Sequence, residues 1–265
     1  MAAPTLRASL DTVRAVYISA VDRKGEHVTD LTASDLVVKE NGQPRDVVEL
    51  VPATEPCHVA VLVDDGGNGL MQMPVAALLN AAPERAVFSI SMLNPQSIRL
   101  NDYTTDRDLL QKSVNRLVQR GRLQRDPMIL SDAVAWTAKE MRKRELSRPI
   151  IVTVTNGAES TEREIAREIL EDLRASGASL HLVHVVGQDL SSVMVEGPMQ
   201  SGGSSTVSNS TQGFAEAMTA IGRTLAHQYR LTYRLPDGVK PSERLQVSTT
   251  RPNVKVVAPT RIPDR

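Results

Sequence analysis

The strongest constraint on the fold is a nearly continuous apolar run, His58-Val59-Ala60-Val61-Leu62-Val63, which ends at two aspartates. A strand that is apolar on both sides must be covered on both faces, as the central strands of α/β sheets are. Strand-like and helix-like segments alternate after this run. We therefore predict an α/β fold with a doubly wound, mostly parallel open sheet, whose ligands bind at the carboxyl ends of the strands.

Hydrophobic periodicity predicts the other elements between residues 56 and 228. Strands are expected at 86–93, 97–103, 149–155 and 180–186, and helices at 70–81, 106–119, 131–144, 162–175 and 214–227. Trp136 and Met141 fit the apolar face of their helix, and we predict that both are core residues. The stretch 188–212 is rich in Ser, Gly and Thr, a composition that favours a mobile loop.

Both ends of the chain have β patterns. Strands are predicted at 13–21, 36–40, 46–50, 229–235, 244–250 and 254–257, and Asn41-Gly42 is a strong hairpin signal. These strands cannot easily join the central sheet. We expect residues 12–55 and 229–262 to pair with each other as a small β module beside a domain at 56–228.

Composition excludes several classes of partner. The chain has 31 basic and 31 acidic residues, so no global field attracts nucleic acid, and aromatic residues are only 3% of the chain. No stretch approaches the length of a membrane span, and the first residues do not resemble a signal peptide, so membrane insertion is not expected. The single cysteine, Cys57, cannot form an internal disulfide.

Two polar segments follow predicted strands: Asp64-Asp65-Gly66-Gly67-Asn68-Gly69 and Thr155-Asn156-Gly157. They resemble the Asp-x-Ser-x-Ser and Thr-Asp-Gly motifs of the von Willebrand factor A domain family. In that family the two motifs, with a threonine from an intervening loop, form a metal-ion-dependent adhesion site. The fold that this resemblance implies agrees with the doubly wound sheet predicted above.

The resemblance covers nearly the whole chain and is closest to the bacterial von Willebrand factor A-related proteins, which are usually secreted. It therefore implies an extracytoplasmic location, periplasmic or secreted. The segments outside the site that carry it are Asp22-Arg23-Lys24-Gly25, Leu31-Thr32-Ala33-Ser34-Asp35-Leu36, Glu40-Asn41-Gly42, Leu225-Ala226-His227-Gln228-Tyr229-Arg230-Leu231-Thr232-Tyr233 and Arg251-Pro252-Asn253-Val254-Lys255-Val256.

The chain departs from the family where the metal would bind. Gly66 and Asn68 stand where the family has serines, Met128 stands where it has the threonine, and Asn156 replaces an aspartate. A hard cation needs oxygen ligands, and neither glycine nor methionine side chains supply one. We expect a degenerate adhesion site without a metal or other cofactor. Two alternatives stay open: Mg²⁺ held by Asp64, Asn68 and Asn156 with help from Asp65 or Asp126, or loop capping by Asp64 and Asn156 alone.

The function expected from this sequence is protein binding, of the adhesion or scaffolding type, without catalysis and with a protein partner of unknown identity. The candidate partner-binding residues, which we call the rim, are Asp64, Asp65, Gly66, Asn68, Asp126, Met128 and Asn156. The alternatives are a purely structural or assembly module and a weak metal-dependent hydrolase. The chain lacks a Gly-x-x-x-x-Gly-Lys phosphate loop, the dinucleotide spacing and a Gly-x-Ser-x-Gly elbow.

Overall fold

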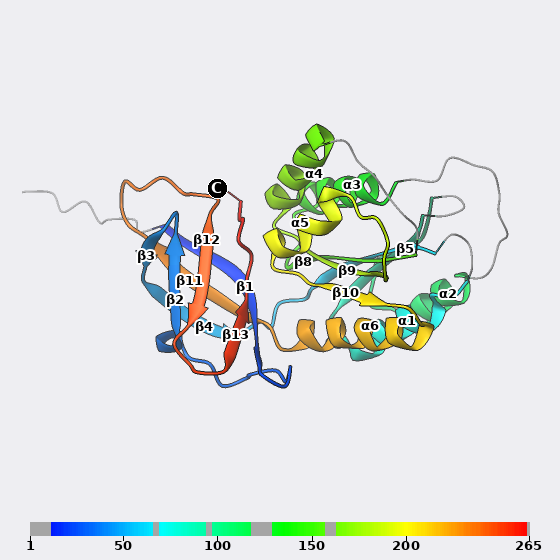
Figure 1. Ribbon diagram of the computed structural model, residues 1–265, viewed down its shortest axis with the longest axis horizontal. Coiled ribbons are helices and arrows are strands. Elements are labelled where there is room, and N and C mark those ends of the chain that lie inside the picture. Colours follow the sequence, from blue (N-terminus) through cyan, green and yellow to red (C-terminus); the bar gives the residue numbers. More distant parts are fainter. Residues whose placement is uncertain (1–11, 66–68, 94–96, 118–128, 157–162, 264–265) are drawn as a thin grey trace, which may run out of the picture.

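The computed structural model describes residues 12–65, 69–93, 97–117, 129–156 and 163–263. At its centre is a six-stranded sheet with the order β10-β9-β8-β5-β6-β7, in which all neighbours are parallel except β7 against β6 (Figure 1). Its strands are β5 (His58–Asp64), β6 (Val87–Met92), β7 (Ile98–Thr104), β8 (Pro149–Thr155), β9 (Ser179–Val185) and β10 (Ser205–Ser208). This order confirms the predicted doubly wound fold.

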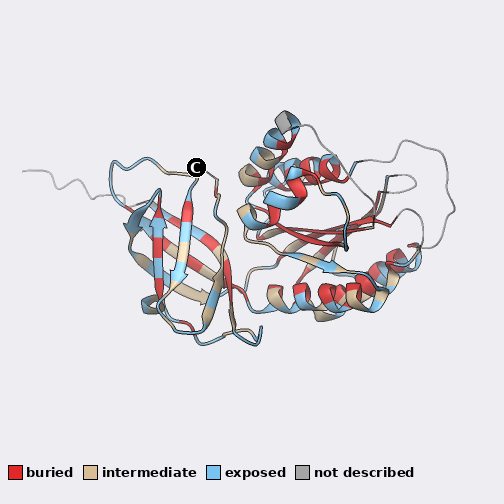
Figure 2. Cartoon of the chain, viewed as in Figure 1, coloured by how far each residue is buried: buried red, intermediate tan, exposed pale blue. Residues whose placement is uncertain are grey.

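Helices cover both faces of the sheet. They are α1 (Gln72–Ala81), α2 (Arg107–Asn115), α3 (Leu130–Lys143), α4 (Arg163–Ser176), α5 (Ser192–Ser201) and α6 (Thr211–Ala226). Val59, Val61 and Val63 of β5 pack in one core with residues of α1, α2 and α6, whereas Ala60 and Leu62 pack in a second core with residues of α3, α4 and α5. The continuous apolar run is thus explained by burial on both faces, which Figure 2 shows in red along the central strands.

The prediction of a mobile loop at 188–212 is wrong. This stretch contains helix α5 and edge strand β10, because Val193 and Met194 are fully buried and Ser191 caps the helix by accepting a hydrogen bond from the Met194 amide. The small residues serve close packing. A Cβ added at Gly203 would lie 1.8 Å from the carbonyl oxygen of Leu180, so only glycine allows β10 to approach β9 this closely.

The two ends of the chain pair as predicted, in two antiparallel sheets that we call the terminal β module. Their orders are β13-β1-β11-β4 and β12-β2-β3. The strands are β1 (Thr12–Asp22), β2 (Leu36–Glu40), β3 (Gln43–Arg45), β4 (Val47–Pro52), β11 (Tyr229–Leu235), β12 (Leu245–Thr249) and β13 (Val254–Val257), with a 3-10 turn at Ala33–Asp35. One buried cluster, which includes Ile18, Val38 and Leu231, forms its core.

One strand of the terminal β module differs from the prediction. The return strand after Asn41-Gly42 is β3, not 46–50, and β4 pairs with β11 in the other sheet. The chain changes sheets after three residues because Val47 and Leu50 pack against the core that contains Leu231.

Trp136 is also not where its helical spacing predicted. Its side chain is 52% exposed, whereas Met141 is buried as expected. The residues of α3 that face the sheet include Ala133, Val134 and Met141, and the indole lies outside this stripe with the Arg99 guanidinium 4.8 Å from its ring centroid.

The buried Arg148 side chain joins the terminal β module to the amino-terminal end of the six-stranded sheet. Its Nη1 donates to the carbonyl oxygens of Ala53 and Glu55 at 3.3 and 3.4 Å, in the segment that enters β5. Its Nε and Nη2 donate to Gln228 Oε1 at 3.0 and 2.7 Å, and Nη2 also donates to the carbonyl of Leu225. One guanidinium therefore holds both chain segments that connect the module to the rest of the protein.

Candidate functional site

The candidate site lies where the strand order reverses. The chain passes from β5 to β6 on one side and later returns to β8 on the other side of β5. In open α/β sheets, ligands bind outside the carboxyl ends of the strands at such a switch point. Asp64 and Thr155, the last residues of β5 and β8, lie directly opposite each other in register. The structure thus brings together the two motifs that the sequence singled out.

Asp64 is held between the two strand ends. Its side-chain Oδ2 accepts a hydrogen bond of 2.9 Å from the Thr155 hydroxyl. Its backbone carbonyl accepts one of 3.1 Å from the backbone N–H of Asn156. Only 8% of the residue is exposed. The Asp64 carboxylate therefore fixes the position at which the loop after β8 begins, rather than standing open on the surface.

Asp65 organises the loop that follows β5. Its Oδ2 accepts a hydrogen bond of 2.9 Å from the backbone amide of Gly69, a glycine with φ of 73°. Its carbonyl accepts one of 3.1 Å from Asn156 Nδ2. Asp65 is buried and Asn156 is half-buried, so Asn156 is the described rim residue whose side chain is most open to a partner.

Two side chains at this site, Thr155 and Gln188, are not among the rim residues predicted from the sequence. Thr155 belongs to the quoted motif, but its role as the partner of Asp64 depends on strand register, which the sequence does not give. Gln188 lies after β9 and donates from Nε2 to the Thr155 hydroxyl at 3.4 Å, while its Oε1 accepts from the Val185 amide at 3.2 Å. Gln188 fell in the stretch predicted as a mobile loop, and no residue pattern identified it.

Four rim residues, Gly66, Asn68, Asp126 and Met128, lie outside the described residues. Behind the site, the buried Ser131 and Ser191 hydroxyls lie 2.9 Å apart and connect the first turn of α3 to the N-cap of α5.

The described side chains at the strand ends are only part of the donor set that the resemblance implies for a metal-ion-dependent adhesion site. They offer the Asp64 and Asp65 carboxylates, the Thr155 hydroxyl and the Asn156 amide. The Asp64 carboxylate accepts from Thr155, the Asp65 carboxylate accepts from the Gly69 amide, and Asn156 turns its nitrogen toward the Asp65 carbonyl. By sequence, Gly66 and Met128 bring no side-chain oxygen. Among the described residues, no three His, Cys, Asp or Glu side chains are grouped as a metal site would require.

The two histidines of β9, His181 and His184, contact neighbouring residues of the fold. His181 is fully buried on β9, where its Nδ1 lies 2.9 Å from the Ser204 hydroxyl. Burial lowers the pKa of His181 to about 4, so the ring is neutral at pH 7. His184 contacts the carbonyl of Val185 at 3.0 Å through its own Nδ1.

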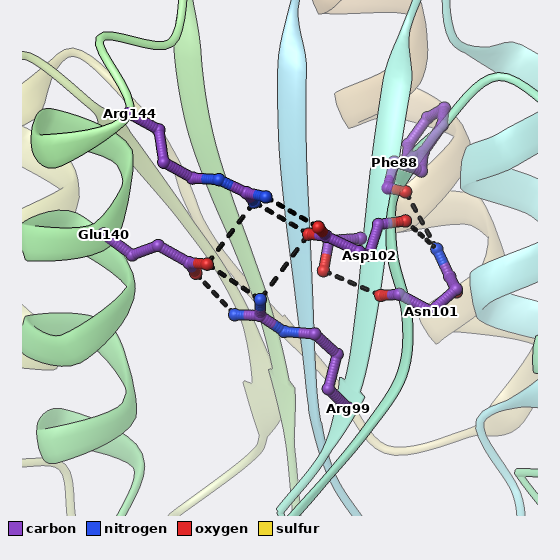
Figure 3. A network of polar contacts seen from close by, with 7 residues as sticks. Phe88, Arg99, Asn101, Asp102, Glu140 and Arg144 are labelled. Atoms are coloured by element: carbon purple, nitrogen blue, oxygen red, sulfur yellow. Dashed lines mark hydrogen bonds and ion pairs between the residues drawn. The ribbon is translucent and has the colours of Figure 1, made fainter.

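A second polar network ties edge strand β7 to α3 (Figure 3). Arg144 donates to Asp102 with a shortest distance of 2.6 Å, Arg99 pairs with Glu140, and Asn101 Nδ2 donates to the Phe88 and Asp102 carbonyls at 2.9 Å each. The hydrogen bond from Arg144 lowers the pKa of Asp102 to about 2. Asp102 lies near the start of β6 in register, so its pair with Arg144 lies toward the amino-terminal end of the sheet, away from the site.

No family model matches the chain, and no curated protein matches it. The chain is similar to von Willebrand factor A domains of solved structure. The VWA domain of SpRpn10 is 14% identical, with 63% of this chain and 97% of that one covered and a TM-score of 0.48.

Two further solved structures are similar. A von Willebrand factor type A protein from Catenulispora acidiphila is 9% identical over 98% of this chain and 76% of its own, with a TM-score of 0.47. The conserved hypothetical protein BatB from Bacteroides thetaiotaomicron is 9% identical over 64% of this chain and 98% of its own, with a TM-score of 0.45.

No helix within the described residues is long and apolar enough to cross a bilayer.

Proposed function

We propose that this chain is a non-catalytic protein-binding domain of the von Willebrand factor A type, whose partner contacts the rim without a metal ion. The observation that carries the proposal is the hydrogen bond between Asp64 and Thr155 at the switch point of the sheet. This bond joins two loops at the edge where ligands of such sheets bind. The Asp-x-Ser-x-Ser and Thr-Asp-Gly resemblance supports an adhesion type of function.

In this proposal, Asp64 and Asp65 hold the loops in shape and do not themselves contact the partner. Both carboxylates are buried and accept hydrogen bonds, one from a hydroxyl and one from a backbone amide. Such bonds fix loop shape, as Asp side chains commonly do in turns. The contact surface is then formed by the loops that the aspartates hold, with Asn156 as the described residue best placed to reach a partner.

Partner capture tests this proposal with two matched amide removals. Asn156→Ala removes a rim amide, and Gln246→Ala removes an exposed amide from β12 in the terminal β module. The immobilised wild-type chain is used to isolate a partner from an extract of the producing cells, and both variants are then compared with it in a binding titration. We expect partner binding to be at least tenfold weaker for Asn156→Ala and unchanged for Gln246→Ala. Weaker binding of Gln246→Ala with unchanged binding of Asn156→Ala would favour an assembly module that joins its partner through the strands of the terminal β module.

Metal titration tests the second half of the proposal. The chelator-treated chain is titrated calorimetrically with magnesium, manganese and calcium, alongside Asp64→Ala. No saturable binding at millimolar metal is the expected result. Saturable binding that Asp64→Ala abolishes would mean a working adhesion site, and would reopen the metal-dependent hydrolase.

We also propose an extracytoplasmic location for the chain, which rests on the resemblance to secreted bacterial proteins. Fractionation of the producing cells followed by detection with an antibody tests it directly. Recovery only with cytoplasmic markers would contradict it.

A further inference from the structure

A cavity of about 220 Å³ lies between the terminal β module and the amino-terminal end of the six-stranded sheet. It is at the opposite end of the strands from the rim. Its walls are mainly apolar and include Val16 of β1, Ile150 of β8, Leu170 and Leu173 of α4, and Ile262 near the end of the chain. Pockets that bind small molecules are often apolar, lie between packed units and carry a few polar groups.

The charged residues that line this cavity are all of one sign. Within the described part of the chain they are three arginines, Arg148, Arg174 and Arg261, and no aspartate or glutamate lines it. The Arg148 donors are engaged by carbonyl oxygens and Gln228, so this guanidinium forms part of the wall. Arg174 and Arg261 also line the adjoining polar hollow, which Glu171, Glu196 and Glu243 line as well, so the two arginines stand where the cavity and the hollow meet.

A carboxylate from the chain itself already contacts both of these arginines. Glu243, which lines only the adjoining hollow, pairs with Arg174 through Oε2 and with Arg261 through Oε1, the latter at 2.7 Å. Its side chain is 36% exposed, so it stands at the surface and not inside the cavity. Two guanidiniums that share one carboxylate can accept a second anion, and arginine is well suited to bind carboxylates.

We infer that this cavity binds a small amphipathic acid, whose apolar body fills the cavity and whose single carboxylate contacts Arg174 and Arg261. The apolar walls select the body of the ligand, and the guanidiniums of Arg174 and Arg261 select its head group. Glu243 acts as an internal competitor for the same two guanidiniums. This site is independent of the rim, so its test does not depend on the proposed function.

Calorimetric titration of the full chain with octanoate tests the inference, with 1-octanol as the uncharged probe. We expect saturable binding of one octanoate per chain and at least tenfold weaker binding of octanol, because octanol lacks the charge-assisted hydrogen bonds. Absence of saturable octanoate binding, or equal binding of octanol, would overturn the proposal.

Three variants sharpen the test. Arg261→Leu is expected to weaken octanoate binding about tenfold through loss of a charged hydrogen bond. Arg251→Leu is the matched control, since Arg251 also pairs with a carboxylate at 2.7 Å, has the same 32% side-chain exposure and lies outside the cavity. It is expected to bind octanoate as the wild type does.

Glu243→Gln keeps the test decisive even if Arg261→Leu fails to fold. Removal of the internal competitor is expected to tighten octanoate binding about threefold, the equilibrium effect of losing a half-exposed ion pair. Unchanged or weaker binding to a folded Glu243→Gln chain, judged by circular dichroism, would contradict the assigned position of the carboxylate.

Discussion

The two ends of the six-stranded sheet are held by different kinds of interaction. At the carboxyl end, short uncharged side chains donate hydrogen bonds, such as Thr155 to Asp64 and Asn156 to Asp65. At the amino end, Arg148 alone bonds to four residues of two connecting segments, and Arg174 and Arg261 share Glu243. The first end is therefore suited to exchange a few bonds with a partner, whereas the second gives the sheet a fixed support.

The largest expected effect comes from breaking the fixed end. Arg148→Met leaves the carbonyls of Ala53, Glu55 and Leu225 and the Gln228 amide without their buried donor. We expect the free energy of unfolding to fall by about 4 kcal/mol, as measured by urea denaturation. Arg251→Leu, which removes an exposed ion pair, should change the free energy of unfolding far less. Equal losses of unfolding free energy in the two variants would mean that the buried Arg148 bonds stabilise the fold no more than an exposed ion pair does.

Acid should weaken the amino-terminal half of the sheet through His181. The pKa of this buried ring is lowered from 6.5 to about 4, so the unfolded chain binds the proton first as the pH falls. The contribution of His181 to stability is complete above pH 6.5 and is lost as the pH drops toward 4. It amounts to about 3 kcal/mol.

This pH dependence is measured by comparing urea unfolding at pH 7 and pH 4.5 for the wild type and for His181→Gln. The variant cannot take up this proton, so its loss of stability between the two pH values should be smaller than that of the wild type. Parallel losses in the two proteins would show that other groups cause the acid sensitivity.

The smallest of these effects is expected at the carboxyl end. Asp64→Ala removes a buried acceptor of the Thr155 hydroxyl and should lower the free energy of unfolding by about 2 kcal/mol. Asp64→Asn keeps an oxygen that can accept the same bond and should cost less. Thr155→Val should cost less in an Asp64→Ala background than in the wild type, because the bond to Asp64 is already absent and only the 3.4 Å bond from Gln188 is lost. Full additivity in urea unfolding would mean that the two residues act separately.

Much of the architecture was predictable because burial on two faces leaves a plain trace in the sequence. The run at 58–63 identified the central strand, and the alternation of strands and helices gave the parallel sheet. The Ser- and Gly-rich stretch around α5 was misread because its small residues serve a helix cap and the close approach of Gly203 to Leu180. Composition alone does not separate such packing from a flexible loop.

The site was predictable only in part. Motif resemblance brought Asp64 and Asn156 together, but the bond to Thr155 and the approach of Gln188 depend on strand register and on a loop from β9. The cavity could not be predicted at all, since its walls come from β1, β8, α4 and the end of the chain. Residues that share a surface only after folding leave no local pattern.

The pairing of β1 with β11 also constrains the order of events during synthesis. Thr12 lies opposite Leu235, so β1 leaves the ribosome before the α/β sheet is made and waits for its neighbour β11 until that sheet is complete. Loop closure over such a length is slow for an unfolded chain. Once the intervening sheet has folded, it brings Pro52 and Tyr229 side by side in β4 and β11. The two neighbours of β1, β11 and β13, both follow the six-stranded sheet in the chain, so a nascent chain stalled before β11 would expose β1 as an unpaired edge.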